Sequence, residues 1–161
     1  MLKIMKEKWA KNESLLREAI ANIPNVHSIS YLDLVKMTFK VIYNTSEEWD
    51  SNCLDLDNIV DIDHGNYQGT LMYVIPFDVY QPGPNDYLIT HVYYGSCSGC
   101  DTLQHIQSIG WNWDAHKPDE KQVSGLMTLC RDLVMSTVKP YNYGWRHDDK
   151  FDQVEFEESG E

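Results

Sequence analysis

The sequence predicts an α+β fold, in which a three-stranded antiparallel β-meander packs against N- and C-terminal helices. Apolar residues recur at helical spacing in 1–23 and again in 121–138. The segment between them, 59–94, instead contains short runs of β-branched and aromatic residues separated by turns. Short connections favour antiparallel pairing, because parallel strands need long crossovers.

The N-terminal part predicts two helices. The first spans residues 1–23 and ends at Pro24, because proline lacks the N–H that would continue it. The second is expected to begin at Ser30, where Asp33 stands three residues later and can accept hydrogen bonds from free N–H groups. Its expected apolar face consists of Tyr31, Leu34, Val35, Thr38, Phe39 and Ile42.

The middle of the chain predicts three strands. Residues 44–58 are polar and are expected to form a loop. The strands follow at 59–63, at 70–75 and at 87–94, with strong turn chemistry in 81–86. The connections are too short for helical crossovers, so a meander is expected.

Two further helices are expected after the strands. The first spans 101–109 and ends at Gly110. The second spans 121–138 and ends at Pro140. Its expected apolar face consists of Val123, Leu126, Met127, Cys130, Leu133, Val134 and Thr137.

Length and composition narrow the class of protein. The 161 residues suit one domain, expected at 1–149 and followed by an acidic, flexible tail at 150–161. The net charge of −12 disfavours binding to nucleic acids and to anionic membranes. No apolar run reaches the roughly 20 residues of a membrane helix, and the charges in 1–8 are unlike a signal peptide. Four cysteines do not make a disulfide scaffold, so we expect a cytoplasmic protein.

The segment 95–101 carries the least generic chemistry of the chain. It joins a predicted strand to a predicted helix and places Cys97 and Cys100 three positions apart. Two such thiols can share a metal, form a disulfide or simply pack in a tight junction. A zinc site needs four ligands, and only two are present here. The candidates to complete it are His91, His105, Cys53 and Cys130.

The same segment also suits redox chemistry or an anion. A helix N-terminus lowers the pKa of a thiol, and its free N–H groups attract anions. Strand, Cys-x-x-Cys and helix is the order found in thioredoxin, although here a meander precedes the pair and no tryptophan stands ahead of it. Asp101 acts against a thiolate, because a nearby carboxylate disfavours a second negative charge.

Three other places in the sequence are candidate sites. Asp61, Asp63 and His64 form either a divalent-ion site at a hairpin or the polar side of a half-exposed strand. The Gln-Gly-Thr run at 68–70 is either a glycine bend or backbone exposed to a ligand. The last group consists of aromatic residues that stack on a ligand or cover the core: Trp111, Trp113, Tyr141, Tyr143 and Trp145.

Three segments together resemble a set of small uncharacterised proteins of bacteriophages and of bacterial genomes that carry phage-derived genes. They are Tyr-Gln-Gly-Thr at 67–70, Tyr-Gly-Ser-Cys-Ser-Gly-Cys-Asp-Thr-Leu-Gln at 94–104 and Leu-Met-Thr-Leu-Cys at 126–130. The resemblance implies an intracellular phage protein and supplies a context without a mechanism. The resemblance also strengthens the case that Cys97, Cys100, Asp101 and Gln68 belong to a functional site.

These observations predict a small acidic phage accessory protein of the cytoplasm. We expect it to bind or regulate a host or phage protein, or to bind a small anionic ligand, through the surface of the cysteine loop. The alternatives are a thiol–disulfide redox protein and a module stabilised by zinc on Cys97 and Cys100. The residues expected to form the site are Gln68, Gly95, Ser96, Cys97, Ser98, Gly99, Cys100 and Asp101.

Overall fold

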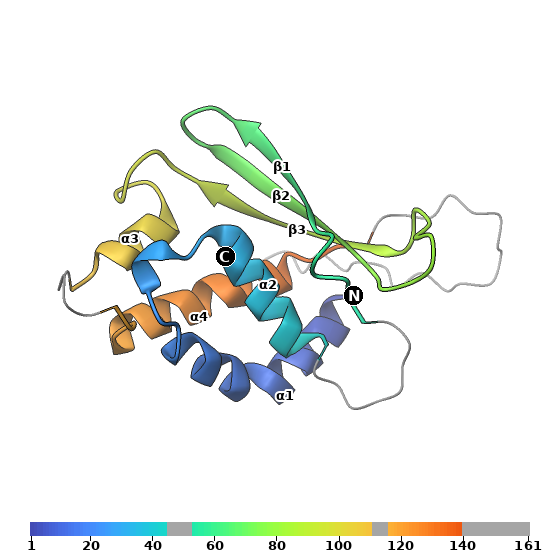
Figure 1. Cartoon of the computed structure of the whole chain (residues 1–161), viewed down its shortest axis with the longest axis horizontal. Helices are drawn as coiled ribbons and strands as arrows, with labels where there is room; N and C mark the ends of the chain where they lie inside the picture. Colours follow the sequence, from blue (N-terminus) through green and yellow to red (C-terminus); the bar gives the residue numbers. More distant parts are fainter. Residues whose placement is uncertain (45–52, 111–115, 140–161) are drawn as a thin grey trace, which may run out of the picture.

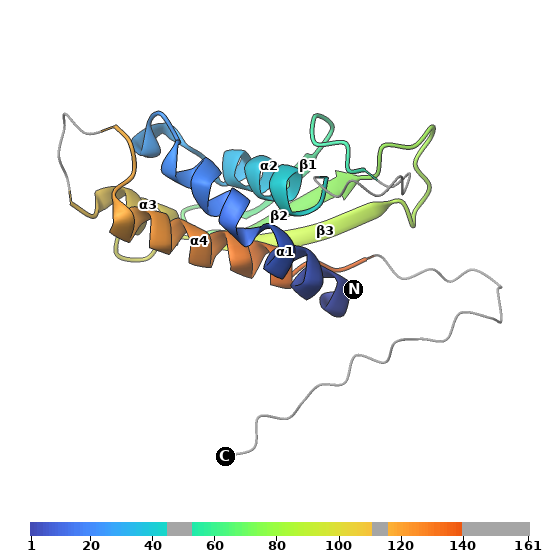
Figure 2. The same ribbon diagram turned by 90° about the horizontal axis from the view of Figure 1, so that it is seen from below.

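The chain folds into a layer of helices and a three-stranded antiparallel sheet, as the sequence predicts (Figure 1). The computed structural model describes residues 1–44, 53–110 and 116–139. Figures 1 and 2 show the helices of this part on one side of the sheet. In chain order the elements are α1 (Leu2–Ala21), the 3-10 helix η1 (Val26–Ser28), α2 (Tyr31–Ile42), β1 (Val60–Gly65), β2 (Gly69–Pro76), β3 (Tyr87–Tyr94), α3 (Thr102–Ser108) and α4 (Glu120–Met135).

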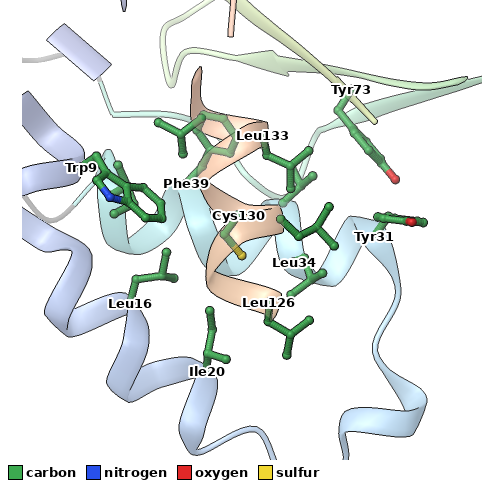
Figure 3. Packing of buried hydrophobic residues seen from close by; sticks show 14 of the residues in the cluster. Trp9, Leu16, Ile20, Tyr31, Leu34, Phe39, Tyr73, Leu126, Cys130 and Leu133 are labelled. Atoms are coloured by element: carbon green, nitrogen blue, oxygen red, sulfur yellow. The ribbon is translucent and has the colours of Figure 1, made fainter. Parts of the chain in front are cut away.

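Helices α1, α2 and α4 pack together through apolar faces and build most of the core (Figure 3). The start of α2 is the predicted capping box. The Ser30 hydroxyl accepts the Asp33 N–H at 3.2 Å, and the Asp33 carboxylate accepts the Ser30 N–H at 2.8 Å. The six residues predicted for the apolar face of α2 are all buried, so this prediction is confirmed.

The sheet has the order β1-β2-β3, and its helix-facing side carries the buried residues Tyr73, Ile75 and Leu88. Gly69 begins β2 and pairs with Gly65 of β1 on one side and with Tyr94 of β3 on the other. This register places the bend between β1 and β2 at the same end of the sheet as the start of the cysteine loop.

Helix α4 is shorter than predicted. It ends at Met135, whereas the sequence pattern extended it to residue 138. Val138 instead exchanges two backbone hydrogen bonds with Ile89 of β3, both at 2.8 Å. The Val138 side chain continues the helical pattern of apolar residues, but the Val138 backbone pairs with β3 at the edge of the sheet. Pro140 has no N–H with which to continue such a ladder.

Several predictions fall on residues outside the described ranges. They concern the tail at 150–161, the boundary of the domain at 149 and the aromatic residues at 111, 113, 141, 143 and 145. These stay predictions. Among the helices that the structure describes, none is long and apolar enough to cross a membrane.

Candidate functional site

The cysteine loop connects the end of β3 to the start of α3. The N–H groups of Cys100 and Asp101 both donate to the Cys97 carbonyl, at 3.0 and 2.8 Å. These two bonds close a turn that brings residues 97 and 100 together. The two sulfur atoms lie 3.0 Å apart, and both cysteines are exposed and free. The structure thus places Cys97 and Cys100 side by side at a strand-to-helix junction, as predicted.

The surroundings of the two sulfurs stabilise a negative charge on Cys100. Its Sγ accepts the Cys97 N–H at 3.2 Å, and the Ser96 hydroxyl lies 3.7 Å away. The side chain of Cys97, followed by that of Ser96, lowers the pKa of Cys100 below its ordinary value. Cys100 therefore ionises at a lower pH than an ordinary thiol.

The close turn requires glycine at position 95. A Cβ atom there would stand 2.7 Å from the Cys100 sulfur and would also clash with the Cys100 carbonyl oxygen. A Cβ at Gly99 would instead meet its nearest neighbour, the Cys97 sulfur, at 3.8 Å, which is an ordinary contact. The two glycines of the loop therefore differ: Gly95 is needed for packing, and Gly99 tolerates a side chain.

Asp101 lies beneath the loop and is only 4 % exposed. Its carboxylate accepts hydrogen bonds from the Gly95 N–H at 3.0 Å, the Tyr31 hydroxyl at 3.1 Å and the Gln104 N–H at 2.8 Å. Burial raises the pKa of Tyr31 to about 12, so this phenol remains a donor. Asp101 thus connects the loop to α2 and caps α3. It acts as a positioning residue, in a role that the sequence alone did not reveal.

The geometry gives the predicted anionic ligand little support. The N–H groups of Gly95, Cys97, Cys100 and Asp101 donate within the protein. The first turn of α3 is already capped by the Asp101 carboxylate. Ser96, Ser98 and Gly99 form the exposed outer part of the loop beside the two thiols.

Cys97 and Cys100 provide two of the four ligands that a tetrahedral zinc site needs. Within the described ranges, no three His, Cys, Asp or Glu side chains are grouped to hold a metal ion. The zinc site stays a prediction. The four residues considered to complete it, His91, His105, Cys53 and Cys130, do not form such a group with the pair, and Cys130 is fully buried.

The acidic residues of β1 lie on the side of the sheet that faces the helices. Tyr94 reaches across β2, where its partner is Gly69, and donates from its hydroxyl to the Asp63 carboxylate at 2.7 Å. This hydrogen bond raises the pKa of Tyr94. Asp61 lines a pocket on the same side.

Gln68 is exposed at the bend between β1 and β2, and it makes no hydrogen bond with the described residues.

An open pocket of about 510 Å³ lies on the inner side of the cysteine loop. Its walls come from the start of α2, from all three strands and from α3. This pocket could not be predicted from the sequence, because its residues are far apart along the chain. Its lining includes the tyrosines Tyr31, Tyr73 and Tyr94, the carboxylates of Asp61 and Asp101, and the loop residue Gly95.

Comparison of the chain with protein-family models, curated proteins and solved structures found no match. The resemblance of the cysteine segment to phage-type proteins stays a prediction. Function is therefore inferred from the loop and the pocket themselves.

Proposed function

We propose that the chain acts by reversible thiol–disulfide exchange between Cys97 and Cys100 and a partner disulfide. The observation that carries this proposal is the exposed pair of sulfurs 3.0 Å apart. A disulfide bond holds its sulfurs at about 2.05 Å, so closing the pair needs a movement of only about 1 Å.

Cys100 is the attacking group, because the loop stabilises its thiolate. The thiolate attacks one sulfur of the partner disulfide, forms a mixed disulfide and expels the other partner sulfur as a thiolate. Cys97 then loses its proton and attacks the Cys100 sulfur, which expels the second partner sulfur. Two electrons pass from the protein to the partner. The two protons of the dithiol end on the partner's thiols, and the reverse sequence oxidises a partner dithiol.

This chemistry fits a regulatory protein as well as an enzyme. Oxidation changes the loop surface formed by Ser96, Ser98 and the two cysteines, and a partner that contacts this surface then senses the change. The proposed setting is the one that the cysteine segment suggests, a phage-type accessory protein that acts on a host or phage protein in the cytoplasm. The charge of −12 favours a partner with a basic surface.

Oxidised glutathione tests the proposal directly. Reduced protein is incubated with it near neutral pH, and the products are mapped by mass spectrometry. We expect a Cys97–Cys100 disulfide in the native chain and a glutathione trapped on Cys100 in Cys97→Ser. Cys100→Ser should react much more slowly at Cys97. Cys53→Ser is the matched control, since it removes an exposed thiol outside the loop.

Two results would overturn the proposal. One is modification of Cys53 as fast as that of Cys100, because it would show that the loop gives no activation. The other is stoichiometric zinc in the purified protein that is released when Cys97 and Cys100 are alkylated. That result would favour the zinc-stabilised module.

A further inference from the structure

The pocket beside the loop brings together tyrosines from three elements. Tyr31 begins α2, Tyr73 lies in β2, and Tyr94 ends β3. Carboxylates come from Asp61 on β1 and from Asp101 at the start of α3. Among the described residues that line the pocket there is no lysine, arginine or histidine.

Tyr73 has a hydroxyl that the described part of the chain leaves without a hydrogen-bond partner, although the residue is only 2 % exposed. Figure 3 shows its side chain extending from the sheet toward the region of Tyr31. A ligand with N–H groups that enters the pocket can therefore donate a hydrogen bond to the Tyr73 oxygen.

The electrostatic environment of the pocket is negative. Burial, and after it the charges of Asp61, Asp33 and Asp63, contribute to raising the pKa of Tyr73. Asp101 is buried and carries its own charge into the wall, although its oxygens already accept three hydrogen bonds. An anion placed here would meet carboxylates, whereas a cation would be attracted by them.

We propose that this pocket binds an organic cation, an ammonium or guanidinium group on an aliphatic stem. Tyr94 is the least buried of the three tyrosines, so its ring can attract a cation through its negative face, and the exposed Asp61 supplies a charged acceptor. Leu71 and Leu103 line the pocket with apolar surface against which the stem packs. The head group comes either from a lysine or arginine side chain of a partner or from a free amine. Binding does not require the thiols, so it is independent of the exchange reaction.

The test is a titration of the full chain followed by the backbone amide signals in NMR. The probes are butylammonium and butylguanidinium, with neutral 1-butanol and anionic butyrate as controls. We expect the two cations to shift the signals of Leu71, Gly95 and Leu103, and the controls to leave them in place. The tripeptide Gly-Lys-Gly distinguishes the sources: tighter binding than butylammonium indicates a partner's side chain, and equal binding indicates a free amine. Both results support a cation site.

Two matched variants locate the binding. Asp61→Asn should weaken the binding of both cations by roughly tenfold, because it removes the charged acceptor. Asp57→Asn makes the same change of net charge at an exposed acid that does not line the pocket, and it should leave binding within about twofold. A double variant, Cys97→Ser with Cys100→Ser, should bind the cations normally even if thiol exchange is abolished.

Three outcomes would overturn the proposal. Binding of 1-butanol as tight as that of butylammonium would show an apolar pocket with no preference for charge. Tighter binding of butyrate would show an anion site. Absence of any shift with cations up to about 50 mM would show that the pocket does not recognise them.

Discussion

Cys100 and Cys130 carry the same thiol in opposite environments. Cys130 lies on the inner face of α4, fully buried among residues such as Phe39 and Leu126 (Figure 3). Burial raises the pKa of Cys130 to about 12. Cys100 lies in an exposed loop, where the Cys97 and Ser96 side chains lower its pKa. The structural element around a cysteine, more than its presence in the sequence, decides whether its thiol reacts.

The cause of the difference is what surrounds each sulfur. An apolar helix face offers little to stabilise a thiolate, so Cys130 remains protonated and serves as a small apolar side chain. In the loop, the turn directs a backbone N–H and a hydroxyl toward the Cys100 sulfur.

The largest expected effect is on alkylation of the native protein. Cys100 should react with iodoacetamide at pH 7 at least about 10³ times faster than Cys130, because Cys130 must wait for unfolding that costs about 5 kcal/mol or more. Peptide mapping by mass spectrometry measures both rates in one sample. Comparable rates at the two positions would show that α4 opens readily and that the contrast is false.

The second effect is a loss of stability at alkaline pH. The unfolded chain releases the Cys130 proton near the ordinary pKa of 9.0, whereas the folded chain retains it to about 12. The contribution is complete below pH 9 and falls as pH rises, by about 2 kcal/mol at pH 10.5. Tyr31 acts in the same direction above pH 10, since its pKa is also raised to about 12.

Urea denaturation at pH 8 and 10.5 measures this loss. Cys130→Ala should lose less stability between the two pH values than the native chain, whatever its stability at pH 8. Cys97→Ala is the control, and it should leave the loss in place. An equal loss in Cys130→Ala and the native chain would show that the buried thiol does not contribute.

The third effect concerns the two glycines of the loop. Gly95→Ala should lower the free energy of unfolding by about 1–3 kcal/mol, because its Cβ meets Cys100 at too short a distance. It should also slow disulfide closure, since the turn must open. Gly99→Ala should stay within about 0.5 kcal/mol. Equal effects of the two substitutions would mean that the loop adapts, and that the turn is not built around Gly95.

Local patterns predicted the parts of the fold that depend on neighbours in sequence. The capping box of Ser30 and Asp33 fixed the start of α2, and three-residue spacing brought the two cysteines together. The end of α4 could not be predicted in this way. The backbone of Val138 pairs with that of Ile89, which lies 49 positions earlier in the chain (138 − 89).

The same distinction applies to the candidate site. Sequence reasoning identified the loop, but it expected Asp101 to oppose a thiolate. In the structure this carboxylate accepts a hydrogen bond from the hydroxyl of Tyr31, which lies 70 positions away along the chain. The pocket was missed for the same reason, since its three tyrosines come from separate elements. Which sulfur is activated was also beyond the sequence, because it depends on how the turn directs one N–H and one hydroxyl.

The pH profile of Cys100 alkylation tests whether Cys97 and Ser96 activate Cys100. The rate is followed from pH 5 to 10 in the native chain, in Cys97→Ser and in Ser98→Ala, which removes a loop hydroxyl that is not bonded to the sulfur. We expect a midpoint below the ordinary value of 9.0 in the native chain and in Ser98→Ala, and a higher midpoint in Cys97→Ser. A midpoint at or above 9.0 in the native chain, or one unchanged by Cys97→Ser, would contradict this activation.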